Sequence, residues 1–91
     1  MTWQQTHSRW QALKDVEATV ATDPLAPLPW TAAYADLFGD RDGLVAYLRY
    51  RWLLRLAEPA VDDVHRESPA RTLARVGLAA LDLQEARRAV A

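Results

Sequence analysis

The sequence predicts an all-α protein. Apolar residues recur at helical spacing, capping residues mark several helix ends, and no segment shows the alternation of a half-buried strand. At 91 residues the chain is near the lower size limit for one self-sufficient hydrophobic core. We expect a single all-helical domain over residues 1–91. Its architecture would be a compact bundle of four to five helices, with a Pro-rich extended loop between the first two.

The first helix is expected at about residues 3–21. Thr2 and Gln5 form a capping-box pattern at its start, and the residue before Pro24 disfavours its continuation. One apolar stripe follows from the spacing of Trp3, Trp10, Leu13, Val16 and Val20. His7 lies on the tryptophan side of this helix, where a half-buried structural role is expected.

The next segment, PLAPLPW at 24–30, has three prolines and is expected to be extended, close to polyproline II. Thr31 then caps a short helix, AAYADLF, which ends at Gly39. Asp40 is the predicted N-cap of the third helix.

The third helix, at about 41–57, contains most of the stretch LRYRWLLRLAEP. In helical projection its polar residues form a narrow strip, and the rest of its circumference is nearly all apolar, as in a buried helix. Two interpretations remain open. Either this is the central helix, covered by its own chain, or part of it stays uncovered until a partner or a second copy docks. Pro59 either kinks the helix or starts a new one.

For the second interpretation, the predicted partner interface consists of Tyr47, Tyr50, Arg51, Leu54 and Arg55. Tyrosine, tryptophan and arginine are the residue types enriched at the energetic centres of protein interfaces.

Arg49 interrupts the apolar arc of the third helix and is expected to need a carboxylate, because an unpaired buried charge is very unfavourable. Asp42, two turns earlier on the same side, is the nearest local candidate, so a buried ion pair between Arg49 and Asp42 is predicted. Asp36 or an acidic residue of the last helix is the alternative.

The last helix is expected at about 69–89, with Ser68 as its cap and Pro69 at its first position. Leu73, Val76, Ala80 and Leu83 lie on one apolar stripe, with Gly77 and Leu81 beside it.

Composition excludes several classes of site. The chain has no cysteine, so disulfides, thiolate metal sites and a cysteine nucleophile are impossible. Its two histidines and three isolated glycines form no recognised metal, phosphate-loop or nucleophile motif. Asp62 and His65 share a helical face, which we interpret as a solvated face. We expect no cofactor, no metal and no enzymatic activity.

The charge distribution is mild. Residues 1–45 carry three basic and six acidic side chains, and residues 46–91 carry eight basic and six acidic, giving −3 and +2. No basic segment precedes an apolar one at the N-terminus, and no apolar run is long enough to span a bilayer. A cytoplasmic protein without membrane contact is therefore expected. Ten arginines against one lysine, with frequent alanine, suggest a GC-rich bacterial source.

The segment FGDRDGL resembles the turn that closes the helix-turn-helix of TetR-type regulators, through Tyr34, Phe38 and Gly43-Leu44. That resemblance implies DNA binding. The expected recognition helix, however, is preceded by PLAPLPW and carries Asp36 with no basic residue for phosphate contacts. We therefore expect a small non-catalytic protein-interaction module, either an accessory subunit, an adaptor or an inhibitor, and plausibly a homodimer. A DNA-binding transcriptional regulator with a degenerate helix-turn-helix is the alternative.

Overall fold

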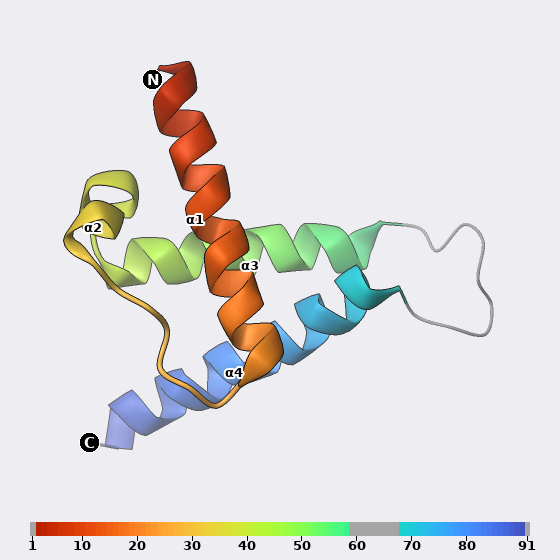
Figure 1. The fold of residues 1–91 in the computed structure, drawn as a ribbon. Helices are drawn as coiled ribbons and strands as arrows, with labels where there is room; N and C mark the ends of the chain where they lie inside the picture. The colour runs from red at the N-terminus through yellow and green to blue at the C-terminus, as the bar shows by residue number, and fades with distance from the viewer. Residues whose placement is uncertain (1, 59–67, 91) are drawn as a thin grey trace.

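The computed structural model describes residues 2–58 and 68–90. Within these ranges the chain forms four helices and no strand, which confirms the all-α prediction. The helices, shown in Figure 1, are α1 (Trp3–Thr22), α2 (Ala32–Phe38), α3 (Arg41–Ala57) and α4 (Pro69–Val90). The predicted course of the chain at Pro59 and the Asp62–His65 pair lie outside the described residues.

Capping residues fix the helix ends where the sequence predicts them. The four predicted N-terminal caps each accept a hydrogen bond from a backbone N–H in the first turn of their helix: Thr2, Thr31, Asp40 and Ser68. Gly39 ends α2 with a φ of +85°, a left-handed conformation that glycine adopts without a steric penalty. The polar turn between α2 and α3 therefore follows from local sequence alone.

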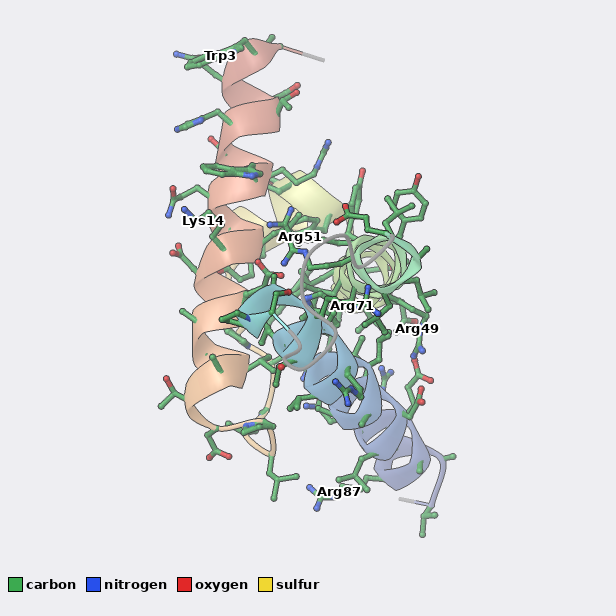
Figure 2. The ribbon with its side chains drawn as sticks, turned by 90° about the vertical axis from the view of Figure 1, so that its right-hand side faces the viewer. Trp3, Lys14, Arg49, Arg51, Arg71 and Arg87 are labelled. Atoms are coloured by element: carbon green, nitrogen blue, oxygen red, sulfur yellow. The ribbon has the colours of Figure 1, made fainter. Side chains whose placement is uncertain are left out.

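The helices form two layers, with α1 in one and α3 and α4 in the other (Figure 2). α1 lies across α3 and α4, and its N-terminal half extends beyond them (Figure 1). The molecule measures 42 × 39 × 20 Å, so its thinnest dimension is about two helix diameters. One side of α3 is not covered by the other helices and stays exposed. None of the helices in the described part of the chain is both long enough and apolar enough to cross a membrane.

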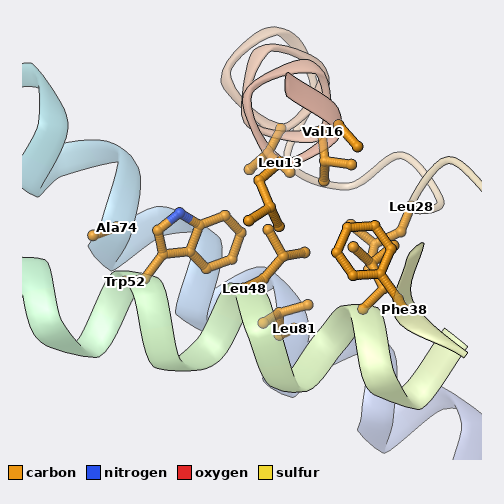
Figure 3. Packing of buried hydrophobic residues seen from close by; sticks show 11 residues of the cluster. Leu13, Val16, Leu28, Phe38, Leu48, Trp52, Ala74 and Leu81 are labelled. Atoms are coloured by element: carbon orange, nitrogen blue, oxygen red, sulfur yellow. The ribbon is translucent and has the colours of Figure 1, made fainter. Parts of the chain in front are cut away.

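The core forms where α1, α3 and α4 meet (Figure 3). Its largest fully buried side chains are Trp52, Leu44, Leu48, Leu81 and Val16. Leu28 from the segment between α1 and α2 is also buried, and the Gln84 side chain donates a hydrogen bond to the carbonyl of Ala26 in that segment. These contacts hold residues 23–31 against the helices.

Trp52 determines how closely α3 and α4 pack. A Cβ atom added at Gly77 would lie 2.6 Å from two atoms of the Trp52 ring, closer than real Cβ atoms approach other atoms. Ala74 beside it is fully buried. The large indole therefore requires small residues on the facing side of α4.

This requirement changes which side of α4 faces the core. Its buried residues are Ala74, Gly77, Ala80 and Leu81. Two members of the predicted apolar stripe, Val76 and Leu83, are 37% and 41% exposed. The other two members agree with the prediction, since Ala80 is buried and Leu73 packs against the core. The buried face of α4 is therefore turned from the predicted stripe toward Gly77 and Leu81, because the small residues there admit the Trp52 ring.

Two arginines bind the carbonyl ends of helices, where the helix dipole favours a positive charge. Arg71 of α4 donates hydrogen bonds to the carbonyls of Leu56 and Glu58 at the end of α3, at 3.2 and 2.8 Å. Arg9 of α1 donates to the carbonyl of Leu37 at the end of α2, at 3.3 Å. These contacts join helices that are distant in sequence.

Candidate functional site

A carboxylate buried between α1 and α3 organises this side of the molecule. Glu17 accepts hydrogen bonds from the Nε and Nη2 atoms of Arg51, both at 3.2 Å, and from Trp52 Nε1 at 2.8 Å. Arg55 Nη1 lies 3.6 Å from the same carboxylate. We call these four residues the Glu17 cluster. The Glu17 side chain is 9% exposed, so its charge is compensated almost entirely by protein groups.

The Glu17 cluster fills the space between α1 and α3, which is wider than the space between α3 and α4. The backbones of α3 and α4 come close together, whereas α1 reaches α3 mainly through long side chains. Figure 2 shows Arg51 between α1 and α3. Arginine and tryptophan can fill such a gap and still satisfy a buried carboxylate.

The positions of Arg51 and Arg55 differ from the predicted partner interface. The prediction groups them with Tyr50 and Leu54 on one contact face. In the structure both guanidinium groups point toward α1, and their side chains are only 23% and 26% exposed. The cause is Glu17, which draws the polar strip of α3 inward.

Arg49 also differs from its prediction. Its partners are Asp82 and Glu85 of α4, at 3.1 and 2.9 Å, whereas Asp42 pairs with Arg88. The predicted pair of Arg49 with Asp42 is therefore wrong, and the alternative of an acidic residue on the last helix is the one found. The pair is also not buried, because the Arg49 side chain is 32% exposed and both acids are more exposed still. The hydrogen bond to Asp82 is the main cause that raises the pKa of Arg49.

Because Arg49, Arg51 and Arg55 pair toward α4 and α1, the surface that α3 presents to solvent from residue 46 to residue 57 is uncharged. We define the outer face of α3 as its exposed uncharged residues Ala46, Tyr47, Tyr50, Leu53, Leu54 and Ala57. Tyr50 is 65% exposed, and Leu53 and Leu54 are 52% and 49% exposed. An ordinary surface helix buries one apolar side and exposes a polar one, whereas α3 buries Leu44, Leu48 and Trp52 and also exposes apolar residues.

Within the outer face of α3, the tyrosines differ in how they are held. Tyr47 packs edge-on against Phe38, with ring centroids 5.4 Å apart, and the Arg9 guanidinium lies 5.0 Å from its ring centroid. Tyr50 projects further into solvent. The face therefore combines an anchored aromatic ring with an accessible one and two leucines.

A second group of exposed aromatic side chains lies on the projecting half of α1. Trp3 stacks on His7 with centroids 5.2 Å apart, Trp10 lies 6.1 Å from His7, and Lys14 Nζ is 4.5 Å from the Trp10 ring centroid. Trp3 is 77% exposed and His7 is exposed as well. The half-buried structural role expected for His7 is therefore not observed.

Residues 2–58 and 68–90 contain no group of three histidine, aspartate or glutamate side chains placed to hold a metal ion. One further titratable group is perturbed. Burial, and secondarily the charge of Asp15, raises the pKa of Tyr34.

Comparison with protein-family models, curated proteins and solved structures finds no match in any of the three. The function must therefore be argued from the geometry of this chain.

The sequence prediction missed the Glu17 cluster, although a signal for it was present. Leu13, Val16, Glu17 and Val20 follow the i, i+3, i+4, i+7 spacing of a helix face that packs on a core. A glutamate within such a face needs buried donors, and an arginine-rich helix elsewhere in the chain could have been proposed to supply them.

Proposed function

We propose that this chain is a small non-catalytic protein-interaction module, acting as an accessory subunit, an adaptor or an inhibitor, and that the outer face of α3 binds its partner. One observation carries the proposal. Arg49, Arg51 and Arg55 pair with carboxylates of α4 and α1. The exposed residues of α3 from 46 to 57 are then tyrosine, leucine and alanine, and the exposed Asp42 lies nearer the start of the helix and pairs with Arg88. Protein interfaces have this composition at their centres, with charged residues depleted and aromatic residues enriched.

The outer face of α3 is also held in place before binding. The other sides of α3 pack against α2 and α4 and are tied to α1 through Glu17. A partner would therefore contact a surface whose backbone is already ordered, which lowers the entropy cost of association. Full burial of an exposed apolar side chain contributes roughly 1.5–3 kcal/mol, and about half of that remains to be gained at Leu53 and Leu54, which are 52% and 49% exposed.

The paired arginines favour a protein partner over DNA, which is the alternative function. Phosphate contacts require accessible cations, whereas Arg49, Arg51 and Arg55 are engaged by carboxylates of the same chain. The short helix α2, which would be the recognition helix, exposes Asp36. Binding to DNA should weaken steeply with salt, and binding through the outer face of α3 should change little.

The proposal includes three expectations from the sequence. The chain would act as one domain over residues 1–91, a bundle of four to five helices with residues 24–30 as an extended Pro-rich strap. It would work in the cytoplasm. It would also form a homodimer.

Substitution of Tyr50 tests the proposed function. Tyr50→Asp should abolish capture of a binding partner by the immobilised protein at both low and high salt, because it places a charge at the centre of the outer face. Trp3→Asp is the matched control, since it alters another exposed aromatic residue on a different helix. Circular dichroism checks that both variants stay folded.

Three results would contradict the proposal. The captured protein could bind equally well to Tyr50→Asp. Capture could also disappear on nuclease treatment or at high salt, which would favour DNA. Finally, Tyr50→Asp could unfold the chain, which would make this face part of the core.

A further inference from the structure

The exposed side of α4 carries a regular pattern that the proposed function does not use. Val76, Ala79, Leu83, Ala86 and Val90 follow one another at steps of three, four, three and four residues, and all five are exposed. We call these residues the α4 seam. Steps that average 3.5 residues are the heptad spacing that keeps an apolar strip facing another helix along its full length.

The α4 seam is distinct from the surfaces that build the fold. The side of α4 that packs on the core uses Ala74, Gly77, Ala80 and Leu81. The uncharged α4 seam has charged neighbours, among them Arg75, Asp82 and Arg87. An uncharged strip bordered by charged side chains is the arrangement of a coiled-coil helix.

Residue size alternates along the α4 seam. One of its two heptad positions holds Val76, Leu83 and Val90, and the other holds Ala79 and Ala86. A parallel, in-register pair of such helices would place leucine against leucine and alanine against alanine, leaving gaps at the alanine layers. An antiparallel pair removes this mismatch.

We propose that a second copy of this chain docks on the α4 seam, with the two α4 helices antiparallel. In the register of greatest overlap, Val76 meets the partner's Ala86 and Leu83 meets the partner's Ala79. Val90 then lies opposite the partner's Thr72. Every layer between two residues of the seam joins a larger side chain to an alanine, so these layers are complementary to one another. The end layers, in which Val90 meets Thr72, join side chains of similar size.

Charge weakens the dimer in this register. Its two-fold axis passes near residue 81, which brings Asp82 toward the partner's Asp82. Two bare carboxylates there would repel each other. Each Asp82 pairs with Arg49 at 3.1 Å, which offsets part of the repulsion, but Arg49 also pairs with Glu85 at 2.9 Å, so the three groups keep one net negative charge in each copy. Figure 2 shows Arg49 at the boundary between α3 and α4.

The area limits the strength of the dimer. From Thr72 to Val90 a helix is about 27 Å long, and at a width of about 10 Å its footprint is roughly 270 Å². A standard interface buries about 800 Å² on each partner. The dimer should therefore be reversible and concentration-dependent. It would present two copies of the outer face of α3, which raises avidity for a multivalent partner.

Single cysteines give a direct test, since the chain has none of its own. Val76→Cys and Ala86→Cys are purified separately and oxidised alone and as an equimolar mixture. The antiparallel register predicts a disulfide-linked dimer in the mixture, and little from either variant alone. Ala46→Cys, on the outer face of α3, is the control for chance collisions.

Light scattering over a dilution series supplies the second measurement. Leu83→Asp should raise the dimer dissociation constant at least about tenfold, whereas Tyr50→Asp should leave it unchanged. Cross-linking of Val76→Cys with itself would overturn the antiparallel arrangement. A mixture that cross-links no faster than Ala46→Cys would overturn the dimer on α4.

The two proposals can fail separately. Loss of partner capture in Tyr50→Asp concerns only the outer face of α3, and loss of self-association in Leu83→Asp concerns only the α4 seam. If Tyr50→Asp abolished the dimer and Leu83→Asp did not, the chain would self-associate through the outer face of α3 and not through the α4 seam.

Discussion

The two sides of α3 reach their neighbouring helices in different ways. On the α1 side the helices are bridged by long side chains that converge on one buried carboxylate, Glu17. On the α4 side the backbones are close, and the Trp52 ring lies directly on Gly77. The ion pairs on that side, formed by Arg49, lie at the surface.

This difference separates two sources of stability in one small core. The α1 side depends on charge and hydrogen bonding, so it is sensitive to the loss of a single polar group. The α4 side depends on shape, so it is sensitive to added volume and tolerant of lost charge. Trp52 belongs to both sides, because its N–H donates to Glu17 while its ring contacts α4.

The largest effect should come from Glu17→Ala. Removing the carboxylate leaves the Trp52 N–H without an acceptor and two guanidinium groups without their anion in a largely dry site. We expect a loss of about 3 kcal/mol in the free energy of unfolding, measured by urea denaturation. Glu85→Ala, at an exposed ion pair, is the control and should cost less than about 1 kcal/mol. Equal losses from the two variants would mean that water already solvates Glu17.

Gly77→Ala should have the next largest effect. Alanine is a better helix former than glycine by about 1 kcal/mol, so an open site would be stabilised by this change. Because the new methyl group would meet the Trp52 ring, we expect a net loss of about 1–2 kcal/mol instead. The change in thermal midpoint distinguishes the two effects. A lower midpoint for Gly77→Ala would mean that the contact with Trp52 dominates, and a higher one would show that α3 and α4 can move apart freely.

Much of the helical layout could be predicted from the sequence because it is set locally. Thr2, Thr31, Asp40 and Ser68 cap their helices through bonds within four residues of chain, and Gly39 supplies the left-handed turn. These capping contacts form between residues close in sequence, so they do not depend on the tertiary packing.

The orientation of the helices could not be predicted in the same way. An apolar projection shows which residues could be buried, but Leu83 and Leu81 are equally apolar and only Leu81 is in the core. The choice depends on the volume of Trp52 on another helix. Likewise, Arg51 and Arg55 turn inward only because Glu17 lies across from them. Both are tertiary effects between residues that are 25 or more positions apart.

Arg49→Leu should have the smallest effect on folding. Arg49 bonds two carboxylates at good distances, but all three side chains are well exposed, so water and salt compete with the pairs. We expect a change of less than about 1 kcal/mol in the free energy of unfolding, and Asp82→Asn should match it. Denaturation at low micromolar protein concentration keeps any self-association from contributing. A loss above about 2 kcal/mol would place Arg49 in a dry environment and make the α4 side of α3 electrostatically similar to the α1 side.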